Sequence, residues 1–118
     1  MKLYIKLVLI SMILVSCIAH KSSSNIQKIN YRIINGTAIN FTDVSLFSDR
    51  LGNLNAYDTI GFNTVFYNSL KHDPLLYCKY ENTNYGRYLM LPNKQNAKVT
   101  YIIDSIQNKI VYIGTIIE

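Results

Sequence analysis

The sequence YRIINGTAINFTDVSLF occupies residues 31–47 and contains two strand patterns around one turn signal. Apolar and polar residues alternate on both sides of Asn35-Gly36, a dipeptide that favours tight turns. Asp43 interrupts the second alternation and the apolar series resumes at Val44, as it would in a strand with a one-residue bulge. These residues therefore predict two short strands rather than a helix.

The rest of the chain repeats this pattern of short strands and turn residues, without an apolar stripe of helical period. Residues 48–53 have turn chemistry, and residues 82–86 predict a hairpin loop. About seven strands at intervals of roughly 8–12 residues predict an all-β fold, a small antiparallel β-sandwich. The expected strands are residues 31–34, 39–47, 59–67, 75–81, 87–91, 98–104 and 109–117.

Two of these strands carry further information about the sheets. The alternation in residues 59–67 places Ile60, Phe62 and Phe66 on one face. The last strand is apolar on both faces over residues 110–117, which favours a central position in a sheet. A short helix within residues 53–58 or 68–72 is also compatible with the sequence.

The pattern Ile-Ile-Asn-Gly-Thr-x-Ile-x-Phe-x-x-Val, residues 33–44, resembles the first hairpin of small immunoglobulin-like and transthyretin-like sandwiches in bacterial envelope proteins. The chain has no tryptophan, so the Cys…Trp…Cys core of antibody domains is absent. This resemblance implies an architecture and no function, because one fold hosts many functions.

The N-terminus has a basic start, an apolar run over residues 7–15 and a cysteine at position 17. Its last part, Leu14-Val15-Ser16-Cys17, resembles the lipobox of bacterial lipoproteins. That resemblance implies cleavage before Cys17 and attachment of a diacylglycerol and an N-acyl chain to this cysteine, with no other cofactor. Because Ile18 and not an aspartate follows, it implies a place in the bacterial cell envelope, on the outer membrane facing the periplasm.

The N-terminal sequence has three alternative interpretations. A transmembrane helix needs roughly 20 apolar residues, whereas residues 7–19 offer 13 positions interrupted by serines. An ordinary secretory signal and a buried structural cysteine after an apolar run stay open. The expected organisation is a cleaved signal helix at residues 1–16, a lipidated cysteine with a flexible polar tether at 17–28, and the sandwich domain at 29–118.

The charge and the cysteine content of the chain limit the classes of binding partner to expect. Without residues 1–16, ten basic and seven acidic residues remain, so the net charge falls from +5 to +3. The remaining residues contain no cluster of lysine and arginine of the kind that binds nucleic acid. We therefore expect no nucleic-acid partner. Lipidation of Cys17 leaves Cys78 without a partner in the chain, either as a buried thiol or in a disulfide to another protein.

The sequence contains no convincing catalytic or metal-binding set. His20 lies in the tether, and His72 and Cys78 would be nearly 20 Å apart on an extended strand. No short-spaced cluster of His, Cys and Asp matches a metal site. We therefore expect neither an enzyme nor a metal or small-molecule site, although a pair of carboxylates is not ruled out by sequence.

The remaining candidate is a hairpin rich in tyrosine. Its aromatic side chains either form a binding face or stabilise the hairpin by cross-strand pairing. We expect a lipid-anchored, non-catalytic docking or assembly module with an envelope protein as partner, as in a secretion complex. The alternative is an inhibitor of a periplasmic or host enzyme that uses residues 82–86. The candidate binding residues are Tyr77, Tyr80, Asn82, Asn84, Tyr85 and Tyr88.

Overall fold

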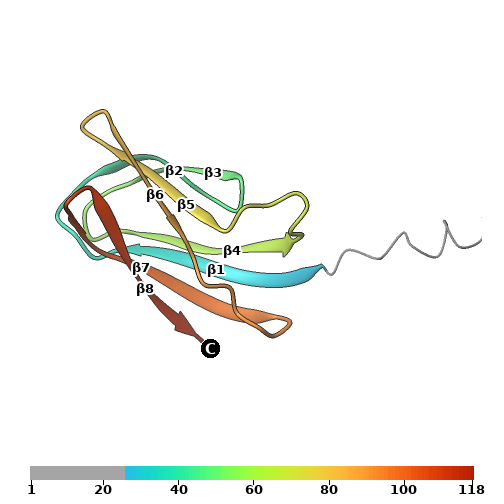
Figure 1. The fold of residues 1–118 in the computed structure, drawn as a ribbon. Coiled ribbons are helices and arrows are strands. Elements are labelled where there is room, and N and C mark those ends of the chain that lie inside the picture. Colours follow the sequence, from blue (N-terminus) through green and yellow to red (C-terminus); the bar gives the residue numbers. More distant parts are fainter. Residues whose placement is uncertain (1–25) are drawn as a thin grey trace, which may run out of the picture.

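The computed structural model describes residues 26–118, which form two stacked β-sheets (Figure 1). Residues 1–25 lie outside the described residues, and with them the signal peptide, Cys17 and most of the tether expected from the sequence. Eight strands follow one another: β1 (Gln27–Asn35), β2 (Phe41–Leu46), β3 (Asp49–Leu54), β4 (Thr59–Tyr67), β5 (Leu75–Tyr80), β6 (Thr83–Tyr88), β7 (Ala97–Gln107) and β8 (Ile110–Ile117).

Each sheet has four strands, in the orders β4-β1-β7-β8 and β3-β2-β5-β6. Neighbouring strands are antiparallel, except that β1 and β7 pair in parallel. A parallel pair needs a long connection, and here β2 to β6 supply it. The predicted all-β sandwich is confirmed, with eight strands instead of about seven.

The additional strand is β3, in a segment predicted to be a turn. The turn is shorter than expected, because Phe47 and Ser48, with φ of 52° and 64°, connect β2 directly to β3. As an edge strand with one partner, β3 tolerates turn-forming residues, including Gly52 at φ 87°. The prediction of a turn over residues 48–53 was therefore wrong.

Two other connections are also tighter than the sequence suggested. Glu81 and Asn82 join β5 to β6, while Asn108 and Lys109 join β7 to β8, and all four residues have positive φ. Such two-residue turns match the twist of paired strands. The hairpin loop predicted for residues 82–86 was wrong, since most of it belongs to β6. Residues 53–58 and 68–72 contain no helix in the described structure.

The predicted central position of the last strand was also wrong, because β8 is an edge strand of its sheet. The prediction was based on the apolar residues on both faces of this strand, which suggested burial on both faces. Val111 alone is fully buried, whereas Ile110, Tyr112, Ile116 and Ile117 are exposed. β8 closes a hairpin with β7, and no later strand of the described chain covers its other side.

The two phenylalanines of β4, Phe62 and Phe66, do not share one face with Ile60. Ile60 pairs with the buried Ile33, whereas Phe66 pairs with Lys28 on the outer side of the sheet. The register between β1 and β4 shifts by one residue, which moves Phe62 to the outer side as well. The strand therefore presents two phenylalanines to solvent.

The core lies between the sheets and takes side chains from every strand except β6. Cys78 is completely buried in it beside Leu76, as the alternation of β5 predicted. Phe47 is central among the aromatic rings, with edge-on contacts to Tyr31 at 5.2 Å and Tyr67 at 5.7 Å between ring centroids. Edge-to-face pairs of this kind add to the stabilisation from burial.

Asn35 ties the two sheets together where the chain leaves β1. It is completely buried, and its Nδ2 donates to the carbonyl oxygens of Ile39 at 2.7 Å and Asn55 at 3.0 Å. Its Oδ1 accepts from the backbone N–H of Thr37 at 2.9 Å and from the hydroxyl at 2.7 Å. The side chain therefore connects the β1–β2 and β3–β4 loops with its hydrogen-bonding groups satisfied.

Replacing Asn35 with alanine should lower the free energy of unfolding by about 2–3 kcal/mol, because buried donors and acceptors lose their partners. Asn40→Ala is the matched control, since exposed Asn40 accepts one hydrogen bond, from Ala56 N–H at 2.8 Å, and should cost under ~1 kcal/mol. Urea unfolding of both variants measures the difference. Equal losses would contradict the role of Asn35.

Candidate functional site

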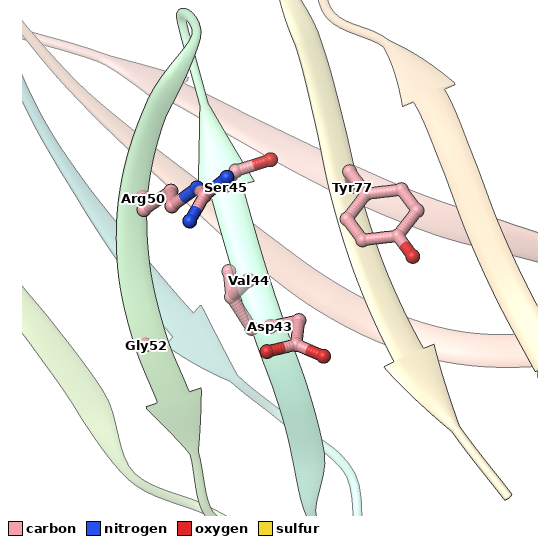
Figure 2. Close-up of a pocket in the computed structure, with 6 residues that line it drawn as sticks. All are labelled: Asp43, Val44, Ser45, Arg50, Gly52 and Tyr77. Carbon is pink, nitrogen blue, oxygen red and sulfur yellow. The ribbon is translucent and has the colours of Figure 1, made fainter. Parts of the chain in front are cut away.

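A hollow of about 470 Å³ lies on the outer face of the β3-β2-β5-β6 sheet (Figure 2). Three strands contribute to it, and four of its six lining residues carry polar side-chain groups. Small-molecule sites are usually lined by apolar and aromatic side chains, so this surface has a different character. The lining residues are Asp43, Val44, Ser45, Arg50, Gly52 and Tyr77.

A row of three residues crosses the hollow from strand to strand. Ser45 on β2 pairs with Arg50 on β3 and with Tyr77 on β5. Paired residues of antiparallel strands share a face, and the neighbours of Tyr77, Leu76 and Cys78, point into the core. The row therefore lies on the solvent side of the sheet, and Figure 2 shows its three side chains on neighbouring strands.

A bulge in β2 shapes the hollow. Asp43 adopts φ 51°, and the pairing of β2 shifts register on both of its sides. The extra residue keeps Phe41 and Val44 in the core while Asp43 is exposed. The bulge predicted from the interrupted alternation is confirmed, and Asp43 lines the hollow together with Gly52 of the neighbouring strand.

The hollow brings opposite charges and hydroxyl groups to one surface. Within residues 26–118, neither the Arg50 guanidinium nor the Asp43 carboxylate has an ion-pair or hydrogen-bond partner. The Tyr77 hydroxyl donates to Asn84 Oδ1 at 2.6 Å, which fixes the ring next to Ser45. An arginine fork and a tyrosine on a rigid sheet can bind a carboxylate, a backbone carbonyl or an aromatic side chain.

The candidate binding hairpin is formed, but its residues divide between two faces. Tyr77, Asn84 and Tyr88 lie on the outer side, where Tyr77 reaches the hollow. Tyr80 and Tyr85 pack against the core from the inner side. These two stabilise the hairpin, as the cross-strand interpretation expects, and cannot share one binding face with the others.

Asn82 occupies the turn of this hairpin with φ 61°. Tyr80, the last residue of β5 before this turn, has a raised pKa, because its hydroxyl hydrogen-bonds to Glu81 and lies in the field of that carboxylate. Sequence reasoning missed Ser45 and Arg50, since it placed Arg50 in a turn. The interruption at Asp43 was the available signal, because bulges often lie next to functional sites.

Cys78 and His72, the conceivable catalytic pair, have separate structural roles. Burial raises the pKa of the Cys78 thiol to about 11, which makes it a poor nucleophile at neutral pH. His72 closes the β4–β5 connection, where its Nδ1 accepts from Asn68 N–H at 3.0 Å. Its ring lies tilted by 31° against the Tyr67 ring, with 6.0 Å between centroids.

Two further properties hold for the part of the chain that the structure describes. It contains no group of three or more His, Cys, Asp or Glu side chains placed to hold a metal ion. Across residues 26–118 there is also no helix of the length and apolarity needed to span a membrane.

No protein-family model, curated protein or solved structure matches this chain. The fold defines its class as an eight-stranded β-sandwich protein.

Gly52→Ala should lower the free energy of unfolding by about 1 kcal/mol, because alanine is strained at φ 87° although open space surrounds the position. Gly61→Ala is the control, since Gly61 also has no neighbour within 4 Å and lacks a positive φ. It should be neutral or stabilising. Urea titrations measure the free energy of unfolding of both variants. Similar losses at both positions would argue against a role for backbone strain at Gly52.

Cys78 should resist thiol reagents at pH 8 in the folded Cys17→Ser chain, where it is the remaining cysteine, and react once the chain unfolds. Because burial raises its pKa from 9.0 to about 11, the unfolded state ionises first. The contribution of this thiol to the free energy of unfolding is therefore fully present below pH 9 and is lost as the pH rises towards 11. Cys78→Ala should remove this part of the pH dependence; rapid labelling of the folded chain would show that the thiol is accessible.

Proposed function

We propose that this chain is a lipid-anchored, non-catalytic envelope protein that docks a partner protein. The lipobox-like sequence before Cys17 supports the anchor and the location on the outer membrane facing the periplasm. The row Arg50–Ser45–Tyr77, which presents an unpaired guanidinium beside a fixed tyrosine, carries the docking proposal.

Arginine and tyrosine are enriched among the residues that contribute most to protein–protein binding. Here their backbones belong to β3 and β5, two strands of one sheet, so little backbone conformational entropy is lost on binding. The partner should present a carboxylate to Arg50 and a flat apolar or peptide group to Tyr77. Asp43 at the same hollow would select against a purely acidic partner surface.

Inhibition of an enzyme is less well supported. That function would need a projecting segment that enters an active-site cleft, and residues 82–86 are mostly strand. Glu81 and Asn82 alone form the tip of the hairpin. We therefore place the binding site at the hollow and not at the tip of the hairpin.

The proposal predicts that Arg50→Ala weakens partner recovery from cross-linked cell envelopes by about 10-fold or more, the loss expected for a central interface residue. Arg87→Ala is the control, because Arg87 is an exposed arginine on the other edge strand of the same sheet, away from the hollow and 5.7 Å from the Tyr112 ring centroid. Labelled palmitate, read in the same cells, should be incorporated by the native chain and lost in Cys17→Ser. Recovery of no specific protein, or equal recovery with both arginine variants, would refute docking at this hollow.

A further inference from the structure

Exposed apolar side chains gather at the end of the sandwich where the chain enters β1. Leu70 is 82% exposed, Phe66 61% and Ile26 52%. Three lysines accompany them, at the start of β1 and in the loops that follow β4 and β6. We call this group the tether-end surface: Ile26, Lys28, Phe66, Leu70, Lys71 and Lys94.

The tether-end surface is a single site although its residues are distant in sequence. Phe66 pairs directly with Lys28 across β4 and β1. Ile26 and Lys94 line a common hollow together with Ser69, the neighbour of Leu70. In Figure 1, the start of β1, the end of β4 and the loops after β4 and β6 all lie at the same end of the sandwich.

Hydrogen bonds hold the two loops of this surface in place. The Gln27 side chain donates to the carbonyl oxygen of Lys94 at 3.1 Å, and Gln95 Nε2 donates to that of Ile26 at 2.9 Å. In the other loop, Leu70 N–H donates to Asn68 Oδ1 at 3.0 Å and Lys71 N–H to Asn68 O at 2.9 Å. The exposed leucine therefore projects from an ordered turn.

The requirements of the fold do not account for these side chains. By contrast, the exposed ring of Phe62 on the same sheet is covered by cations, with Arg32 at 5.0 Å and Lys98 at 5.7 Å from its centroid. Phe66 and Leu70 have no such ring or cation contact among the described residues. A cluster of uncovered apolar residues next to lysines is typical of a surface that lies on a membrane.

We infer that the tether-end surface rests on the phospholipid bilayer, with Leu70, Phe66 and Ile26 at the boundary of headgroups and acyl chains. This inference rests on the proposed lipid anchor. Residues 17–25 can extend to about 30 Å at most, and they lead directly into Ile26. The anchor would thus hold this end of the domain, rather than another, close to the membrane.

The charges favour phospholipid headgroups as the occupant. Lys28, Lys71 and Lys94 attract anionic headgroups, and their long side chains can reach phosphate while the apolar side chains insert. Asp73 and Glu118 lie at the same end and offset part of this attraction. Insertion of the apolar side chains therefore contributes most to the binding of the bilayer, and anionic lipid strengthens this binding.

Such contact would orient the docking site. The β5–β6 turn lies at the end of the sandwich opposite the tether (Figure 1), so it would point away from the bilayer. The hollow with Arg50 and Tyr77 would then open in a direction parallel to the membrane plane, on the flank of the domain. A partner could reach both without displacing lipid.

The test uses the full-length lipidated chain in vesicles of phosphatidylethanolamine and phosphatidylglycerol. An environment-sensitive fluorophore is attached at Leu70→Cys or, as matched control, at Tyr57→Cys, which is 71% exposed in the β3–β4 connection at the opposite end. Buried Cys78 does not compete for the label. We expect nitroxide-labelled lipid to quench the Leu70 probe several-fold more than the Tyr57 probe, and iodide in solution to do the reverse.

A second measurement preserves the native Leu70. A probe at Ser69→Cys should be quenched by nitroxide lipid, and the additional substitution Leu70→Glu should abolish this quenching without unfolding the domain. If all probes behave as aqueous while the chain still floats with vesicles, the inference is overturned and the anchor stands. If the chain does not float with vesicles, the anchor and the inference both fail.

Discussion

The buried amide of Asn35 is the constraint on which the sandwich depends, because it joins the β1–β2 and β3–β4 loops, the two places where the chain crosses between the sheets at this end. Its donors bind the carbonyls of Ile39 and Asn55, while its oxygen holds Thr37. Next to it, Gly36 N–H donates to Ile103 O at 2.9 Å. An added Cβ at Gly36 would lie 3.0 Å from that carbonyl oxygen, so this approach favours glycine. The Asn-Gly pair thus closes one end of the core.

With that end closed, the two sheets present different outer surfaces. The β3-β2-β5-β6 sheet is polar outside, and a bulge at Asp43 opens a hollow between Arg50 and Tyr77. At the other end of the sandwich, Phe66 and Leu70 stand uncovered. The proposed docking and membrane functions therefore use separate surfaces, so one molecule can perform both at once.

Local patterns predicted the parts of this structure that depend on neighbouring residues. The bulge at Asp43 and the inward direction of Cys78 could both be derived, because burial follows the two-residue period of a strand. The strand β3 could not, since glycine and asparagine favour turns and an edge strand tolerates them only in its tertiary context. Arg50 was missed for the same reason, and the hollow was missed with it.

By itself, the sequence determined an all-β chain of short strands, an inward-facing cysteine at position 78 and a lipobox-like N-terminus, since each depends on residue type and local spacing. Only the tertiary structure decided which strands form edges, which phenylalanines meet solvent and which tyrosines share a face. A register shift of one residue between β1 and β4 sends Phe62 outward, and no local pattern encodes the pairing partner that causes it. The sites that these choices create are properties of strands brought together from distant parts of the chain.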